Sequence, residues 1–184
     1  MDEEVAEALV RRALALTTPD GGEADPAPTV ALLLDDPALA GLTRHDILVA
    51  VVQVGRTVVP QWADAYRDRD GPPAAVAAAE AWAADPSPEA AERAARAADR
   101  AIEQALAVWR GALQHAAWAG RTAAWVAMAP RYDWPAVAAL FGACQAIGRA
   151  RVVAAVASAL REPGGCPAEP DSVADPRRQS GFGE

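Results

Sequence analysis

The stretch from Gly71 to Ala129 constrains the fold most, because it is filled with alanine and interrupted by tryptophan. Alanine has the highest intrinsic helix propensity, so a stretch this rich in alanine favours helices. Its small side chain buries little surface, but it allows two helix axes to approach closely, near the lower end of the usual range of about 8–10 Å. The stretch therefore predicts two or three closely packed helices whose bulk is supplied by other side chains.

A helix start stands in the middle of this stretch. Ser87 is a suitable N-cap residue, and Pro88 suits the first helical position that follows it. An apolar stripe at helical spacing comes next, formed by Ala90, Ala94, Ala97, Ala98, Ala101, Ala105 and Val108. Two i,i+4 ion pairs are expected on the outer side, Glu89 with Arg93 and Glu92 with Arg96.

Tryptophan is the obvious source of bulk, since each indole buries on the order of 150–250 Å². Trp118 and Trp125 lie seven residues apart and share one helix face with Gln114, Arg121 and Thr122, so that face is mixed. Two interpretations stay open. In the first, the tryptophan side chains fill the space that an alanine core leaves. In the second, they line a pocket or a contact surface with polar groups beside it. The residues concerned are Trp82, Trp109, Trp118, Trp125 and Trp134.

The rest of the chain also predicts helices. Thr43 and Asp46 have the spacing of a capping box, and the valine-rich run after them is assigned to a helix by its length. Pro60 should kink or split that helix near Val58. Gly111 and Gly120 are possible breaks in the alanine-rich region, and Asp133 should cap the last helix. The further predicted helices cover 2–16, 30–34, 45–70, 74–84 and 134–160.

These elements predict an all-α fold, a single-domain bundle of about six helices over residues 1–161. Residues 162–184 are rich in proline, glycine and acidic side chains, so a disordered C-terminal tail is expected there. The chain begins with acidic residues, unlike a secretory leader, and no apolar run approaches a membrane span. A cytoplasmic protein is therefore expected.

The charge balance disfavours two classes of partner. The net charge is −8, and such a surface repels nucleic acid and anionic lipid, whereas it suits a basic protein. All the positive charge is arginine, a pattern typical of a GC-rich bacterial genome. The two cysteines, Cys144 and Cys166, fit neither a metal spacing nor a disulfide framework. Cys144 lies in an apolar helix, which predicts burial and a raised thiol pKa.

No catalytic constellation is visible in the sequence. Asp64 and Asp68 are one helical turn apart, as metal-binding carboxylates often are, but they lie in an alternating acid–arginine run typical of a solvated face. Asp35 and Asp36 precede a helix start, where carboxylates serve as caps. The two histidines, His45 and His115, have no suitable nucleophile or carboxylate nearby in the sequence. We therefore expect no catalytic residues, no metal and no cofactor.

One part of the chain resembles a known family. Two prolines, an alanine-rich turn and a tryptophan begin the pattern, and an alanine–arginine repeat continues it to Ala98. The segment from His115 to Ala124 follows as a later helix. Together these resemble the helical immunity proteins of bacterial toxin–immunity systems, over about residues 43–129. The chain departs from them in having Gly71 before the prolines and a single later histidine. The residues that form the beginning of the pattern, from the two prolines to the tryptophan, are Pro72, Pro73, Ala74, Val76, Ala79 and Trp82.

The resemblance implies a small cytoplasmic protein that neutralises a cognate toxin by direct contact. The expected function is accordingly non-enzymatic protein binding, with a basic toxin domain as the partner. One alternative is a helical scaffold or regulator that self-associates through its alanine faces. The other is a small-molecule-binding or metal-dependent enzyme that uses Asp64, Asp68 and His115. The expected partner-binding residues are Asp64, Tyr66, Asp68, Asp70, Glu80, Glu89 and Glu92.

Overall fold

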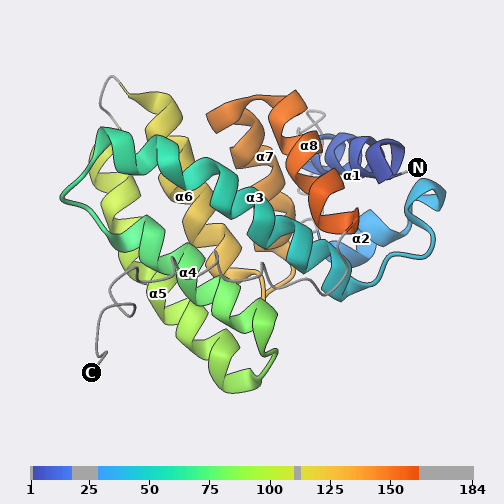
Figure 1. Ribbon diagram of the computed structural model, residues 1–184, viewed down its shortest axis with the longest axis horizontal. Helices are drawn as coiled ribbons and strands as arrows, with labels where there is room; N and C mark the ends of the chain where they lie inside the picture. Colours follow the sequence, from blue (N-terminus) through green and yellow to red (C-terminus); the bar gives the residue numbers. More distant parts are fainter. Residues whose placement is uncertain (1, 18–28, 110–112, 162–184) are drawn as a thin grey trace, which may run out of the picture.

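The computed structural model describes residues 2–17, 29–109 and 113–161, and this part of the chain is all α-helical (Figure 1). The predicted fold class is confirmed, but the described residues form eight α-helices where about six were expected. They are α1 (Asp2–Thr17), α2 (Val30–Leu34), α3 (Arg44–Ala65), α4 (Gly71–Ala84), α5 (Pro88–Val108), α6 (Gln114–Met128), α7 (Trp134–Ile147) and α8 (Arg149–Arg161), with a 3₁₀ turn at Pro37–Leu39. The tail predicted at 162–184 lies outside the described residues.

The two additional helices come from two breaks in segments that were expected to be continuous. The predicted helix 134–160 ends at Gly148, whose φ of +84° and ψ of 151° lie in a region open almost only to glycine. The second break separates α5 from α6. The bend expected at Gly111 falls outside the described residues, whereas the break considered at Gly120 does not occur, because α6 continues through it.

The capping predictions have different outcomes. Thr43 and Asp46 form the capping box: the Thr43 backbone N–H donates to Asp46 Oδ2 at 2.7 Å, and the Asp46 N–H donates to Thr43 Oγ1 at 3.2 Å. Ser87 caps α5 by accepting from the Ala90 N–H at 3.2 Å. Asp133 makes no cap hydrogen bond to α7; its carboxylate accepts from Arg44 Nε at 2.9 Å instead. Sequence reasoning missed this because Arg44 is 89 residues away.

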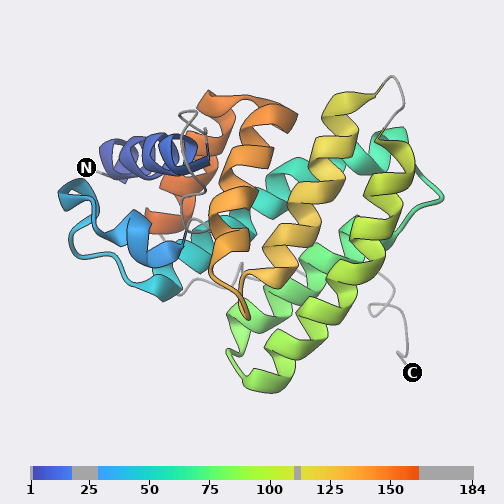
Figure 2. The same cartoon turned by 180° about the vertical axis from the view of Figure 1, so that it is seen from behind.

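The valine-rich helix α3 is the central element of the fold. It crosses in front of α6 and α7 in Figure 1, and Figure 2 shows α5, α6 and α7 from the opposite side. Pro60 does not split α3, which continues to Ala65 with the exposed Pro60 inside it. Trp62, one turn before Tyr66, has no exposed surface, and its indole N–H donates to the Arg69 carbonyl at 2.8 Å. This bond ties the end of α3 to the turn that follows.

The alanine stripe of α5 packs inside the molecule, as predicted. Ala94, Ala98 and Ala101 are fully buried and form a cluster with Ala75 of α4 and with alanines of α6. Helices α4 and α5 form an antiparallel pair that α6 joins, while α1 and α8 pack together at the other end of the molecule (Figure 1). No helix in the described ranges has the length and apolar character needed to cross a bilayer.

Candidate functional site

The first group of predicted binding residues lies where α3 ends and α4 begins. Asp64, Asp68 and Asp70 are exposed there, while Tyr66 is half-buried with its ring centroid 4.7 Å from that of Trp62. Asp70 pairs with Arg100 of α5 at 2.6 Å. Within the described part of the chain, Asp64 and Asp68 have no ion pair, so their charge is open to solvent.

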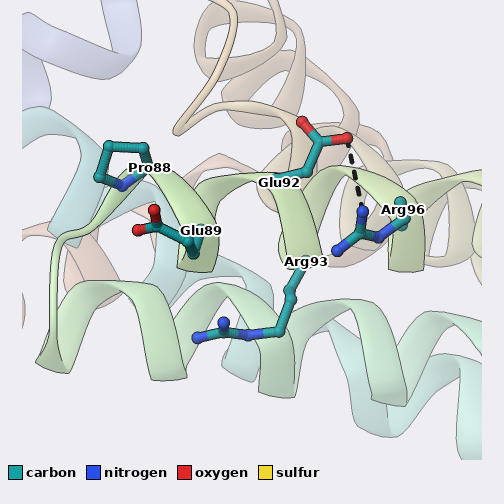
Figure 3. A pocket seen from close by; sticks show the side chains of 5 residues that line it. All are labelled: Pro88, Glu89, Glu92, Arg93 and Arg96. Carbon is teal, nitrogen blue, oxygen red and sulfur yellow. Dashed lines mark ion pairs between the residues drawn. The ribbon is translucent and has the colours of Figure 1, made fainter.

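The second group lies on α4 and α5, and two of its three members are already paired. Glu80 is 2.8 Å from Arg56 of α3, and Glu92 pairs with Arg131 as well as with Arg96, at 3.8 Å for the latter. Glu89 is exposed. The predicted Glu92–Arg96 pair is therefore present. The predicted pair between Glu89 and Arg93 is absent, and Figure 3 shows the two side chains apart.

The structure does not bring the two groups together. The α3–α4 turn and the α4–α5 turn lie at opposite ends of α4 (Figure 1). Helix α4 has 14 residues, which corresponds to about 21 Å at 1.5 Å per residue. A partner that binds Asp64 and Asp68 would therefore have to extend along the whole of α4 to reach Glu89.

A shallow surface depression accompanies the second group. It is open to solvent and is lined by Pro88, Glu89, Glu92, Arg93 and Arg96 (Figure 3). All five residues belong to α5, so no second element closes over the depression. Such a surface suits contact with another protein better than enclosure of a small molecule.

The residues of the enzyme alternative are not grouped either. His115 begins α6 and its Nδ1 lies 2.9 Å from the Gln145 carbonyl oxygen of α7, which fixes the ring between two helices. Asp64 and Asp68 lie at the end of α3 and in the following turn. Over the ranges that the structure describes, no three His, Cys, Asp or Glu side chains are placed to share a metal ion.

The remaining candidate residues have local structural roles. Asp36 accepts from the Ala38 N–H at 2.9 Å and so caps the 3₁₀ turn, as its position predicted. The His45 ring lies near that of Trp82 in a tilted arrangement, with ring centroids 5.9 Å apart. Cys144 is half-buried and not fully buried as the sequence predicted, and this burial raises the pKa of its thiol to about 11, in the predicted direction. Cys166 lies outside the described residues.

A cluster of arginine and tryptophan lies where α5 ends and α6 begins, and the sequence predicted it only in part, as the mixed face of Trp118, Arg121 and Trp125. The guanidinium carbon of Arg121 lies 4.7 Å from the ring centroid of Trp109, 5.3 Å from that of Trp118 and 4.8 Å from that of Trp125. Trp118 also meets Phe141 of α7 edge-on at 5.6 Å. We call Arg121, Trp109, Trp118 and Trp125 the Arg–Trp cluster.

The Arg–Trp cluster combines the two interpretations that the tryptophans left open. Trp125 is only 9% exposed and serves the core, whereas Trp109 and Trp118 are half-buried at its edge. Desolvation by burial lowers the pKa of Arg121. Helical spacing places Trp118, Arg121 and Trp125 on one face, but the contribution of Trp109 depends on how α5 meets α6, which the spacing does not reveal.

Large apolar side chains are exposed in two places. Leu106 and Leu113 flank the end of α5 and the start of α6 and are 56% and 51% exposed. Tyr132 and Trp134 stand at the turn between α6 and α7. The first pair borders the segment that carries the Arg–Trp cluster, so that corner combines apolar surface with a cation.

Comparisons of this chain with protein-family models, with curated proteins and with solved structures found no match. The resemblance to immunity proteins accordingly rests on the residues of the chain itself. The geometry of the described side chains is the other basis for a functional proposal.

Proposed function

We propose that this chain is a non-enzymatic, protein-binding helical domain of the immunity type, which neutralises a basic toxin by direct contact in the bacterial cytoplasm. The observation that carries the proposal is the exposed pair Asp64 and Asp68. These carboxylates stand at the protruding turn between α3 and α4, with no ion pair in the described residues. Unpaired surface charge of this kind is available to a partner of opposite sign.

Physical considerations favour a basic partner. The chain carries a net charge of −8, and complementary fields raise the rate at which oppositely charged proteins associate. Rim charges of this kind affect the association rate and the salt dependence more than the lifetime of the complex. We therefore expect an interaction that weakens with ionic strength, because salt screens exposed charges over about 10 Å at 0.1 M.

The experiment is affinity co-purification of the tagged chain from lysate of its native host, at low and at high salt, followed by mass spectrometry. We expect one basic partner that is recovered at low salt and lost at high salt. The charge-reversal variant Asp64→Arg/Asp68→Arg should lose it. Glu3→Arg/Glu4→Arg is the matched control, since it changes the charge equally at the exposed start of α1. Binding that survives reversal at the turn would rule that surface out.

A second candidate function is self-association, and one observation favours it. Leu106 and Leu113 leave apolar surface exposed at the end of α5 and the start of α6. The alanine stripe of α5 is buried against α4 and α6, so self-association would have to use another face. Molar mass measured by light scattering over a range of concentrations separates the candidates: a dimer sensitive to Leu106→Glu would favour self-association over immunity.

A further inference from the structure

The Arg–Trp cluster holds a cation that the described residues do not neutralise. Arg121 is partly buried between three indole rings, yet no hydrogen bond or ion pair links it to any acceptor within 2–17, 29–109 and 113–161. A guanidinium has five N–H donors in its plane, and stacking on its faces satisfies none of them. These donors are left for solvent or for a ligand.

Two other arginines of the chain provide a comparison for Arg121. Arg44 and Arg131 are more exposed than Arg121, and each has a carboxylate partner, Asp133 and Glu92 respectively. Burial makes a counter-charge more valuable, because an ion loses hydration when it leaves water. Among the described residues, Arg121 thus lacks a carboxylate partner although it is more buried than these two paired arginines.

The walls of the Arg–Trp cluster are held by packing. A Cβ atom on Gly142 of α7 would approach the Trp125 ring to 2.8 Å, so this indole is seated directly on the α7 backbone. Trp109 meets Trp118 edge-on, with centroids 4.9 Å apart. Rings fixed in this way lose little conformational freedom when a ligand binds, which favours affinity.

The surroundings indicate what kind of group the site would accept. Leu106 and Leu113 supply exposed apolar surface at the junction of α5 and α6, the corner to which Trp109 also belongs. The planar fork of a guanidinium matches the two oxygens of a carboxylate, and nearby indole and leucine side chains favour an apolar group. We propose that the Arg–Trp cluster binds the carboxylate of a ligand whose attached group is apolar or aromatic. This site is independent of Asp64 and Asp68 and of the proposed toxin contact.

The test compares two probes of nearly the same shape, one charged and one neutral. Phenylpropionate and its neutral amide are titrated into the full chain, and binding is followed through the tryptophan indole N–H signals in ¹H–¹⁵N spectra. We expect saturable shifts of the Trp109, Trp118 and Trp125 signals with phenylpropionate. The amide should bind about tenfold more weakly or worse, since a hydrogen bond to a charged group contributes more than a neutral one.

Two variants assign the effect to the guanidinium. Arg121→Gln should abolish the preference for phenylpropionate, whereas Arg151→Gln, an equal charge change on the exposed side of α8, should retain it. If Arg121→Gln does not fold, Arg121→Lys serves in its place: it keeps the charge, lacks the planar fork and should bind more weakly. The comparison of acid with amide in the unaltered chain needs no variant.

The source of the carboxylate is resolved by a further pair of probes, N-acetyl-Ala-Phe with a free terminal carboxylate and the same dipeptide as its amide. A dipeptide acid that binds more tightly than phenylpropionate supports the proposal and points to the carboxyl terminus of a polypeptide. Tighter binding of phenylpropionate supports it and points to a small organic acid. Equal binding of acids and amides, or no saturable shift with either acid, would overturn the proposal.

Discussion

Gly120 is the residue of α6 against which the indole ring of Trp62 packs. A Cβ atom at this position would lie 2.6 Å from two ring carbons of Trp62, closer than carbon atoms pack. The ring cannot retreat easily, because it is fully buried and its N–H is bonded to the Arg69 carbonyl. The glycine is therefore required by the close approach of the ring.

Substitution Gly120→Ala tests this contact. Alanine gains about 1 kcal/mol in helix propensity, but overpacking costs about 1–3 kcal/mol, so we expect a net loss of up to about 2 kcal/mol in the free energy of unfolding. Urea denaturation measures it. The loss should shrink in the Trp62→Leu background, as a double-mutant cycle would reveal. A stabilising Gly120→Ala in the unaltered chain would contradict the packing.

Cys144 makes stability depend on pH in the alkaline range. Burial raises the pKa of its thiol from 9.0 to about 11. Below pH 9 the thiol is protonated in both states; between pH 9 and 11 the unfolded chain loses the proton while the folded chain retains it. Stability should therefore fall through this window, by less than the value of about 2–3 kcal/mol expected of a fully buried thiol, because solvent screens this half-buried group.

The measurement is urea unfolding at several pH values from 8 to 11, with Cys144→Ala as the comparison. The chain contains no lysine, so few other side chains titrate in this range, chiefly the two tyrosines and Cys166. These groups are common to the unaltered chain and to Cys144→Ala. A difference between the two proteins in the slope of stability against pH is therefore due to the Cys144 thiol. Equal slopes in the two proteins would show that the thiol is not desolvated by folding.

At the scale of the elements, Gly148 separates α7 from α8. Its backbone angles, φ +84° and ψ 151°, cost a residue with a side chain about 1–3 kcal/mol. Among the residues that the structure describes, no atom lies within 4 Å of a Cβ built there, so the cost is conformational and not steric.

We expect Gly148→Ala to lower the free energy of unfolding by about 1–3 kcal/mol, or to join α7 and α8 into one helix at the expense of their packing. Thermal and urea unfolding give the stability, and far-UV circular dichroism detects added helix. Ala154→Ser, on the exposed side of α8, is the control and should change stability by less than about 0.5 kcal/mol. An unaltered Gly148→Ala protein would mean that the break has another cause.

Local signals predicted most of the elements. Ser87 with Pro88 and Thr43 with Asp46 fixed two helix starts, because a cap depends on residues three positions apart. The break at Gly148 was missed because a glycine within an apolar helical pattern does not reveal its φ. Asp133 does occupy the N-cap position of α7, but its carboxylate makes no cap hydrogen bond and pairs with Arg44, which is distant in sequence. Caps formed between residues close in sequence can be predicted from the chain. An ion pair with a distant residue that engages a capping side chain cannot.

At the scale of the whole molecule, the sequence predicted the acidic character of the surface but not its distribution. Asp70 and Glu80 are paired across helices with Arg100 and Arg56, a fact that depends on tertiary placement. The separation of the two acidic groups along α4 has the same origin. Helical spacing identified the mixed face of Trp118, Arg121 and Trp125, but only the meeting of α5 and α6 adds Trp109 to it. Candidate sites formed within one helix are therefore predictable, and those formed between helices are not.

The pairing of α1 with α8 sets the order in which the chain can complete its fold during synthesis. Arg149 forms an ion pair with Glu7, 142 residues earlier in the sequence, and α1 packs mainly on α7 and α8. At about 5–20 residues per second, the ribosome needs on the order of ten seconds to supply that partner. During this interval the buried face of α1, with Leu9 and Val10, lacks α7 and α8, the two helices that cover most of it. The nascent chain should therefore expose a helix that chaperones can recognise until its last helices emerge.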